Sequence, residues 1–528
     1  MNTGELLVEA ISTQVEDIFG IPGTHGLSLY EGIRKKVEKK ELKFYMPRLE
    51  YGGSIMADYY ARVKGNVGVF LSVNGPGFTN SLTGLAEAYS EGSPLVLISL
   101  NKEFKFRDRR QLHDMGYFDA QIEMAKQITK ATFRIYSPND VPRVVEKAFR
   151  IALEDKMGPV YVEVPVDVLE ENSEIEWTKF NKVNRTLVRP SKEEIKEAID
   201  ILNSCSRPVL LLGYGASRSS LLKYIEEFSI PVFTTIRGKG SIPENHPLFA
   251  GTIFEVKEIP GDCLIALGTS FNDLETHRWS VKLPQKIIHV DVDVNEFDNS
   301  YKAILKIKAS AEAFLEEILE RVRFPKWSVD KEKIKVYHES STDNITHDDL
   351  AKVLDSELSE DRIIITDAGT NQVMAMMIKV YKPNSYFNSL IFNAMGSAIP
   401  ASIGAKIASP DRQVVAIIGD LGFQSCFNEL ITAVENNINF LTVLVKDGVQ
   451  HFLRMNQTMR FGKTFATNVF SIDYAKVAEG IGVEVFKADN KSDLKERVDE
   501  AIRSSYKKPT LLIVNITPTS IPSILLSR

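Results

Sequence analysis

The sequence contains few of the residues that mark secreted, membrane-bound or nucleic-acid-binding proteins. Cysteine occurs only three times in 528 residues, as Cys205, Cys263 and Cys426. Such a dispersed, odd-numbered set provides no disulfide framework and predicts reduced thiols in the cytoplasm. A basic excess is also absent, because the formal net charge is −6. That charge balance argues against nucleic acid as a partner, and no basic helix indicates a membrane surface.

The N-terminus lacks the charge pattern of a signal peptide. Its first twenty residues, MNTGELLVEAISTQVEDIFG, carry early glutamates in an amphipathic pattern instead of a basic segment followed by an apolar run. This pattern predicts a helix. The whole chain is 44% apolar and 25% charged. This composition is typical of a soluble protein, and the length suffices for about three domains with buried cores.

Two polar stretches, residues 169–191 and 324–344, divide the chain into three parts. In each part, apolar segments typical of buried strands alternate with helical segments, which indicates parallel sheets. The predicted fold class is therefore α/β, with three domains that are each a doubly wound, mostly parallel sheet flanked by helices. The predicted domains cover residues 1–170, 190–325 and 345–528. Strands of the central domain are predicted within residues 207–217, 230–236, 263–270 and 285–293.

The most informative segment is residues 414–448. An apolar strand, a turn with Asp420, a helix and a second apolar strand ending at Asp447 follow one another there. Because the carboxyl ends of parallel strands meet at one edge of a sheet, folding would bring both carboxylates together. Mg²⁺ prefers a few such oxygens together with the phosphates of a ligand, so the segment predicts a metal site beside a phosphate. A simple turn with a helix cap is the alternative at this point.

An earlier segment, residues 67–100, repeats the order of strand, glycine turn, helix and strand. The spacing from Gly77 to Leu100 equals the spacing from Gly422 to Val445. We therefore expect two related α/β domains, one near each end of the chain. The alternative is a chance likeness, since any two strand–helix–strand units share this plan.

The downstream segment resembles the diphosphate and metal motif of thiamine diphosphate (ThDP) enzymes, which reads Gly-Asp-Gly and, after a helix and a strand, Asn-Asn. Leu421 stands in place of the second glycine, and Asp447 in place of the second asparagine. Asp447 keeps an oxygen ligand, as in the FAD-independent, catabolic acetolactate synthases. The family glycine usually marks special backbone angles, and we expect Gly422 to supply them here.

Residues 47–62, PRLEYGGSIMADYYAR, are similar to the cofactor-activating segment of the same family. Glu50 falls on the family's glutamate, and Leu49 stands where histidine is common. The resemblance implies that the Glu50 carboxyl group bonds a ring nitrogen of the ThDP aminopyrimidine and relays protons through it. The alternative is an exposed glutamate that opens a helix, where its charge interacts favourably with the helix dipole.

The resemblance covers nearly the whole chain, including NGPGFTN at 74–80, TDAGTNQ at 366–372 and NAMGSAIPASIGAKIASPDRQ at 393–413. It implies that ThDP and Mg²⁺ are bound between two subunits of a homodimer or homotetramer. The implied cofactor-binding residues are Glu50, Pro76, Asn80, Gly369, Thr370, Asn371, Met395, Gly419, Asp420, Leu421 and Gly422. The implied metal ligands are Asp420, Asp447 and, near the end of the motif, the backbone carbonyl of Val449.

The central domain of related enzymes either binds FAD or stays empty. The run between Gly251 and Gly268 is shorter here than the stretch with which FAD-dependent relatives contact the flavin, so we expect no FAD. The segment GYGASRSS at 213–220 has the spacing Gly-x-Gly-x-x-Ser. That is a weak match to a dinucleotide-binding fingerprint.

The resemblance also implies the reaction, in which a 2-oxo acid loses CO₂ and is joined to a second carbonyl compound, as in acetolactate synthases. Leu453 lies where aldehyde-releasing pyruvate decarboxylases carry glutamate, which disfavours rapid protonation. His25 and His113 are candidate catalytic residues that would contact the substrate, because histidine can donate a hydrogen bond to a carboxylate or carbonyl. The alternative for each is a hydrogen-bonded loop histidine.

Two other functions stay open at this stage. One is a 2-oxo acid decarboxylase that releases an aldehyde. The other is a catalytically silent ThDP-binding relative, because Leu49, Leu421 and Asp447 depart from the common motifs.

Overall fold

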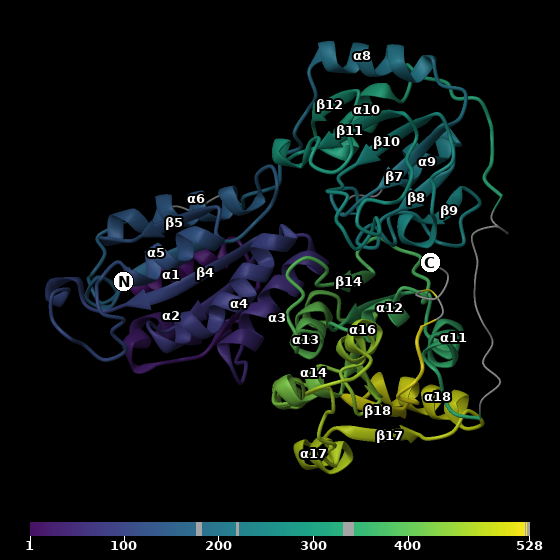
Figure 1. Cartoon of the computed structure of the whole chain (residues 1–528). Helices are drawn as coiled ribbons and strands as arrows, with labels where there is room; N and C mark the ends of the chain where they lie inside the picture. Colours follow the sequence, from purple (N-terminus) through teal and green to yellow (C-terminus); the bar gives the residue numbers. More distant parts are fainter. Residues whose placement is uncertain (176–181, 218–220, 331–342, 523, 525–528) are drawn as a thin grey trace.

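The computed structural model describes residues 1–175, 182–217, 221–330, 343–522 and 524. Three six-stranded sheets follow one another along the chain, and all pairings between their strands are parallel. Helices flank each sheet (Figure 1). The predicted α/β class with three parallel sheets is therefore confirmed. We name the three parts the N-terminal, central and C-terminal units, which lie at the left, top and bottom of Figure 1.

The sheet of the N-terminal unit has the strand order β2-β1-β3-β4-β6-β5. Its strands are β1 (Asp17–Gly20), β2 (Lys43–Tyr45), β3 (Gly68–Ser72), β4 (Leu95–Asn101), β5 (Ala131–Arg134) and β6 (Val160–Pro165). Its helices are α1 (Thr3–Ser12), α2 (Leu27–Glu38), α3 (Glu50–Lys64), α4 (Pro76–Glu91), α5 (Ala120–Ala125), α6 (Val141–Leu153) and α7 (Val166–Leu169). The predicted first helix is α1, where Asn2 and Glu5 form a capping box.

The sheet of the C-terminal unit has the order β14-β13-β15-β16-β18-β17, the same order as the N-terminal sheet when strands are counted within each unit. Its strands are β13 (Arg362–Thr366), β14 (Tyr386–Asn388), β15 (Gln413–Gly419), β16 (Leu441–Lys446), β17 (Glu484–Ala488) and β18 (Thr510–Asn515). Its helices are α11 (His347–Glu357), α12 (Thr370–Ala375), α13 (Ala398–Ala408), α14 (Asp420–Cys426), α15 (Glu429–Glu435), α16 (His451–Phe461), α17 (Tyr474–Ile481) and α18 (Leu494–Ser505). The shared order confirms the predicted internal repeat.

The two copies of the repeat differ in the helix that follows the glycine turn. In the N-terminal unit this helix is the continuous α4, whereas the C-terminal unit has the shorter helices α14 and α15 in its place. Asp420 is the first residue of α14, so the prediction that it lies in a turn is off by one residue. Strand β15 still ends directly before Asp420, so the repeat keeps its strand positions.

The central unit has the order β12-β11-β10-β7-β8-β9, which is that of a dinucleotide-binding sheet. Its strands are β7 (Pro208–Leu212), β8 (Val232–Thr234), β9 (Phe249–Thr252), β10 (Cys263–Leu267), β11 (Lys286–Asp291) and β12 (Leu305–Lys308). Its helices are α8 (Lys192–Asn203), α9 (Leu222–Phe228) and α10 (Ala311–Ile318). The four predicted strands correspond to β7, β8, β10 and β11. The sheet continues at its two edges with the short strands β9 and β12, which the sequence did not predict.

Helices α3 and α13 join the N-terminal and C-terminal units through a shared hydrophobic core. Tyr59 of α3 and Ile399 of α13 are both fully buried in this cluster. The helices approach so closely that a Cβ atom on Gly404 would lie 2.1 Å from the backbone oxygen of Met56. A glycine is therefore required at position 404 for this packing.

The polar stretches predicted at 169–191 and 324–344 are only partly described, because residues 176–181 and 331–342 lie outside the described residues. The predicted domain limits at residues 170, 190, 325 and 345 stay predictions.

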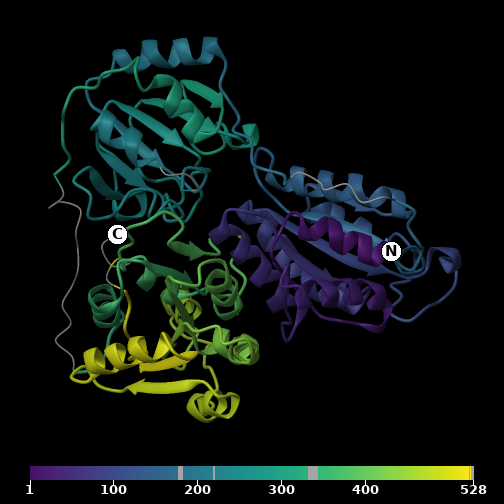
Figure 2. The ribbon, with the colours of Figure 1, turned by 180° about the vertical axis from the view of Figure 1, so that it is seen from behind.

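None of the helices in the described ranges is both long enough and apolar enough to cross a membrane. Seen from behind in Figure 2, the three units again meet around a common junction.

Candidate active site

The two carboxylates predicted to hold a metal meet at one edge of the C-terminal sheet. Strands β15 and β16 pair in parallel, with Gly419 opposite Val445. Asp420 and Asp447 directly follow these strands. The Asp420 Oδ2 atom accepts hydrogen bonds from the backbone N–H groups of Asp447, at 3.0 Å, and Gly448, at 2.8 Å. The ends of both strands are thus joined through the Asp420 carboxylate.

The Asp420 side chain lies in an environment that disfavours a lone negative charge. It is 3% exposed, and its buried Oδ1 atom has no hydrogen-bond partner among the residues that the structure describes. Burial raises the pKa of Asp420, although the N–H group of Gly448 and the Tyr474 hydroxyl act in the opposite direction. A buried, unpartnered carboxylate oxygen is unfavourable unless a cation neutralises it. The donor set therefore fits a metal ion better than a simple helix cap.

Asp447 has a side chain that is 7% exposed and lies beside a histidine. Its Oδ1 accepts a hydrogen bond from the Val449 N–H group at 3.0 Å, and its Oδ2 lies 3.4 Å from His451 Nδ1. Among the described residues, no cluster of three or more His, Cys, Asp or Glu side chains is placed to hold a metal. A cation between Asp420 and Asp447 would thus need further oxygens from the backbone or from a ligand, as hard cations accept.

A cavity of about 240 Å³ opens beside these carboxylates. The predicted residues that line it are Gly369, Thr370, Asn371, Met395, Gly419, Asp420, Leu421, Gly422, Asp447, Val449 and Leu453. The sequence interpretation missed five further lining residues, namely Ala368, Val445, Gln450, His451 and Phe452. No helical spacing indicated His451, because α16 begins at this residue and Asp447 lies in the non-helical segment before it.

Gly422 is required for a reason other than the predicted one. Its backbone has no left-handed φ, so the expectation that it supplies special backbone angles is wrong. A Cβ atom at this position would instead lie 2.1 Å from Oδ2 of Asp367. Asp367 is 1% exposed and accepts a hydrogen bond from the Gly396 N–H group at 3.0 Å, and burial raises its pKa to about 6. The glycine therefore provides space for a buried carboxyl group.

Glu50, the first residue of α3, lies in the N-terminal unit and is half-buried. Its Oε2 accepts a hydrogen bond from Nδ2 of Asn80 at 3.1 Å. Asn80 belongs to α4, whose first residue is Pro76, so these three predicted residues lie together. The start of α3 is fixed from the C-terminal unit, because the N–H groups that precede Glu50 donate to the buried Glu429 carboxylate, with that of Leu49 at 3.0 Å.

His25 and His113 lie side by side near the start of α4. Their ring centroids are 5.3 Å apart, and the Nδ1 atom of each is buried without a hydrogen-bond partner. Burial lowers the pKa of His25, and the neighbouring His113 lowers it further. The His113 backbone has φ of 61°, and a Cβ on Gly75 would lie 2.4 Å from its oxygen. Two close imidazoles with unpartnered nitrogens can donate to an anionic or carbonyl ligand.

The predicted site residues therefore form two separate groups within one chain. Every described residue that lines the cavity beside Asp420 lies between positions 368 and 453, and none comes from the N-terminal unit with Glu50. The cavity of about 240 Å³ is also smaller than the ~300–1,000 Å³ of most ligand sites. Within one chain, the two groups therefore do not share this cavity.

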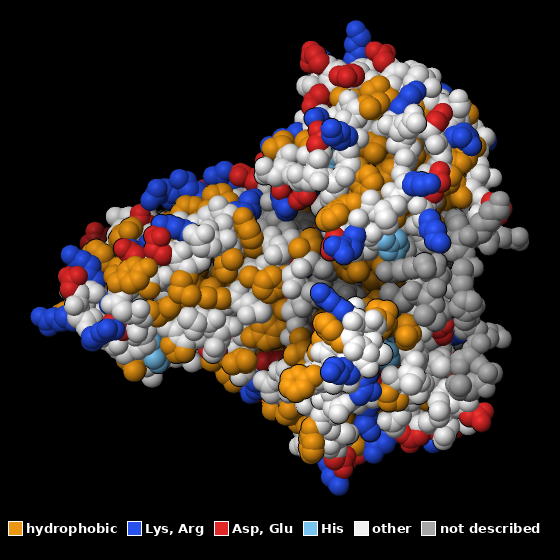
Figure 3. All heavy atoms as spheres, in the orientation of Figure 1, with side chains coloured by type: hydrophobic (Ala, Val, Ile, Leu, Met, Phe, Trp, Pro, Cys, Tyr) orange, Lys and Arg blue, Asp and Glu red, His pale blue; other side chains and the backbone are white. Residues whose placement is uncertain are grey.

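Large apolar side chains are exposed on both units that carry these groups. Leu49 and Leu112 of the N-terminal unit are 40% and 66% exposed, and Phe465 and Phe470 of the C-terminal unit are each 83% exposed. Figure 3 shows apolar side chains at the surface of both units.

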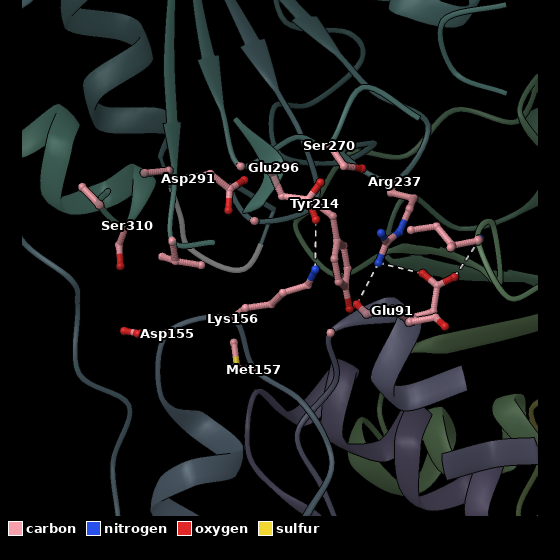
Figure 4. A pocket seen from close by; sticks show the side chains of 18 of the residues that line it. Glu91, Asp155, Lys156, Met157, Tyr214, Arg237, Ser270, Asp291, Glu296 and Ser310 are labelled. Atoms are coloured by element: carbon pink, nitrogen blue, oxygen red, sulfur yellow. Dashed lines mark hydrogen bonds and ion pairs between the residues drawn. The ribbon is translucent and has the colours of Figure 1, made fainter. Parts of the chain in front are cut away.

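A second cavity, of about 100 Å³, lies where the central unit meets the other two (Figure 4). The ends of β7, β10 and β11 reach it, at the place where a sheet of this strand order binds ligands. Two of its cationic side chains are already paired. Arg237 lies 2.7 Å from Glu91, and Lys156 lies 3.0 Å from both Asp293 and Glu296. Burial raises the pKa of Asp291, a further lining carboxyl, to about 7.

Three family models match successive parts of the chain. Their descriptions are thiamine pyrophosphate enzyme, N-terminal TPP binding domain, for residues 1–124; central domain, for residues 195–318; and C-terminal TPP binding domain, for residues 367–514. The N-terminal match includes Glu50 and both histidines. The C-terminal match includes Asp420 and Asp447.

Curated relatives match along almost the whole chain. The probable acetolactate synthase large subunits of Methanococcus aeolicus and Methanocaldococcus jannaschii are each 31% identical over 98% of this chain, and the match covers 93% and 92% of those proteins. The acetolactate synthase of Mycobacterium bovis is 30% identical over 92% of this chain and 83% of its own length. These proteins are similar to the chain in all three units.

Proposed function

Because this chain belongs to the ThDP-dependent, acetolactate-synthase-like family, we propose that it decarboxylates a 2-oxo acid and joins the remaining fragment to a second carbonyl compound. The single observation that carries this proposal is the cavity that Asp420 and Asp447 both line, beside two glycine-containing segments. A catalytically silent relative would have no need to keep a buried, unpartnered carboxylate oxygen at this place.

Asp420, Asp447 and the backbone carbonyl of Val449 are the residues we propose for holding Mg²⁺ against the cofactor diphosphate. The segments 369–371 and 419–422 would line the diphosphate, and Met395 would support the rings. When bound, ThDP supplies an electron sink for the carbon that loses CO₂. The buried Oδ1 of Asp420 supports this assignment, since it accepts no hydrogen bond among the described residues.

Glu50 is the residue we propose for proton relay to the cofactor aminopyrimidine. Asn80 holds one oxygen of its carboxylate at 3.1 Å, and Glu429 fixes the backbone just before it. Both contacts limit where the Glu50 carboxylate can lie, which is what proton transfer at a defined atom requires. His25 and His113, which lie near the start of the same α4, would donate hydrogen bonds to the substrate.

The two groups of residues imply at least a homodimer. We propose that Glu50 of one copy completes the cavity beside Asp420 of another, because the groups are separate within one chain. Exposed apolar side chains on both units are consistent with such an interface. A closed two-fold arrangement would form two equal sites from two copies.

Carboligation is the outcome we propose in preference to release of an aldehyde. Leu453 lines the cavity and is 40% exposed, so the position carries an apolar side chain where aldehyde-forming relatives place an acid. Without a proton donor there, protonation of the carbon that lost CO₂ is slow, and attack on a second carbonyl competes.

The first test concerns Glu50. Replacing it by glutamine keeps the hydrogen bond from Asn80 possible but removes the exchangeable proton, so turnover of a 2-oxo acid should fall by about 10²–10⁴-fold. ThDP binding with Mg²⁺, measured by calorimetry, should change little. Full activity in Glu50→Gln would contradict its assignment.

The second test concerns Asp447. Asp447→Asn keeps an oxygen ligand, so this variant should still bind Mg²⁺ and ThDP. Asp447→Ala should lose both, because the carboxylate oxygens that face the cavity are gone. Calorimetric titration with ThDP at several Mg²⁺ concentrations measures the difference. Equal affinity in Asp447→Ala and wild type would refute the metal role.

The third test concerns the central unit, which we propose to work without FAD. The cavity at its strand ends measures only about 100 Å³, and its Arg237 and Lys156 are paired with carboxylates instead of being available for a diphosphate. Purified protein should be colourless and active without added flavin. Absorbance near the flavin maximum at one equivalent per chain would overturn this proposal.

The fourth test concerns the product. Wild type fed with pyruvate should form more acetolactate than acetaldehyde, as measured by mass spectrometry of both products. Leu453→Glu should shift the ratio towards acetaldehyde, because it places a proton donor at the cavity. Leu453→Gln, of similar size but without the acidic proton, is the matched control and should shift it less. If wild type releases only aldehyde from every accepted 2-oxo acid, the decarboxylase alternative replaces carboligation.

A further inference from the structure

Glu91, the last residue of α4, lies where all three units meet, and its side chain is fully buried. The residue belongs to the N-terminal unit. Its Oε1 accepts a hydrogen bond from the backbone N–H of Ile391, in the C-terminal unit, at 2.9 Å. Its Oε2 lies 2.7 Å from Nη2 of Arg237, in the central unit. Figure 4 shows the Glu91 carboxylate beside the Arg237 guanidinium.

Arg237 is held in place by more than the ion pair. Its Nη2 also donates to the backbone oxygen of Glu91 at 2.9 Å, and its guanidinium carbon lies 4.0 Å from the centroid of the Tyr214 ring. Its side chain is only 10% exposed. A cation with a carboxylate on one side and an aromatic face on the other has little freedom. Arg237 therefore fixes the position of the Glu91 carboxylate.

The backbone that Glu91 holds belongs to the loop between β14 and α13, residues 389–397. No strand partner satisfies the N–H groups of Ile391 and Phe392 in this irregular segment, and Glu91 accepts from both, at 2.9 and 3.5 Å. Because one carboxylate accepts from both N–H groups, this contact constrains the loop.

The same loop carries Met395 into the cavity beside Asp420. After Met395, the Gly396 N–H group donates to the buried Asp367, and the Met395 oxygen accepts from the Tyr51 hydroxyl at 3.0 Å. The loop is therefore held after Met395 by Asp367, and before it by Glu91. The position of the Met395 side chain depends on both attachments.

We infer that Glu91 is a positioning residue for the cofactor cavity. Fixed by Arg237, its carboxylate holds the backbone at Ile391 and Phe392 and so sets the wall that Met395 forms beside Asp420. The identity of the ligand as ThDP rests on the proposed function. The attachment of the loop to Glu91 rests on the contacts alone. All three units thereby affect the position of the loop beside the cavity, although the described residues that line the cavity all belong to the C-terminal unit.

The test combines hydrogen–deuterium exchange with ThDP binding in the full-length protein. Glu91→Ala should accelerate exchange at residues 389–397 and raise the ThDP dissociation constant about tenfold, as expected for one lost buried contact. Glu91→Gln, which keeps an oxygen for Ile391 but loses the charge, should show a smaller effect on both measurements and guards against failure of the alanine variant to fold.

Glu244→Gln is the matched control. Glu244 also has a largely buried side chain, pairs with Lys239 at 2.6 Å, and accepts from the N–H group of Val380 in the C-terminal unit at 3.4 Å. It joins two units as Glu91 does, but it contacts no residue of 389–397. This variant should lower the thermal midpoint without changing exchange at 389–397 or ThDP affinity.

Two results would overturn the inference. One is wild-type exchange at 389–397 in Glu91→Ala. The other is an equal loss of ThDP affinity in Glu244→Gln, which would make the effect a general loss of stability. Failure of the wild type to bind ThDP would contradict the proposed function instead, and the exchange result would then decide by itself whether Glu91 holds the loop.

Discussion

The parallel pairing of β15 and β16 is the constraint on which the rest of the site depends. It sets Gly419 opposite Val445, so the residues that follow each strand meet at one edge of the sheet. The Asp420 carboxylate then accepts hydrogen bonds from the backbone that begins the loop after β16, at Asp447 and Gly448. One carboxylate oxygen holds the two strand ends together, and the other is buried with no hydrogen-bond partner in the described part of the chain. The fold thus prepares a position for positive charge before any ligand arrives.

The N-terminal unit has the same sheet order as the C-terminal unit, but different side chains lie at the corresponding edge. Its helix α4 occupies the place of α14, but the residues at this edge are Asn80 and, from the neighbouring α3, Glu50. One copy of the repeat therefore carries the carboxylates that we propose to hold a metal, and the other carries the carboxylate that we propose for proton transfer. Because α3 packs on α13 within the chain, the two edges are kept in fixed relation, yet they do not share a cavity.

Sequence patterns predicted the elements that are buried on both faces and missed those set by tertiary contacts. The continuous apolar runs of β15 and β16 and the acids that follow them were readable because a parallel strand is apolar throughout. Strands β9 and β12 have four residues each and lie at sheet edges, where the apolar signal is short. The need for glycine at 422 comes from Asp367, which directly follows β13, and no local pattern shows it. The link from Glu91 to Ile391 is likewise invisible along the chain, since it joins residues of different units.

Mixing two inactive variants tests most directly the claim that the active site is built from two copies of the chain. Glu50→Gln lacks the proton-transfer group and Asp447→Ala lacks the metal ligand, and the two can be co-expressed with different tags. If each site takes Glu50 from one copy and Asp447 from another, half of the sites in a mixed dimer contain two defects and the other half none. Random mixing should then restore about a quarter of the wild-type activity. If mixed dimers purified through both tags show no activity, while both variants remain folded, the two residues do not meet across an interface and the account is wrong.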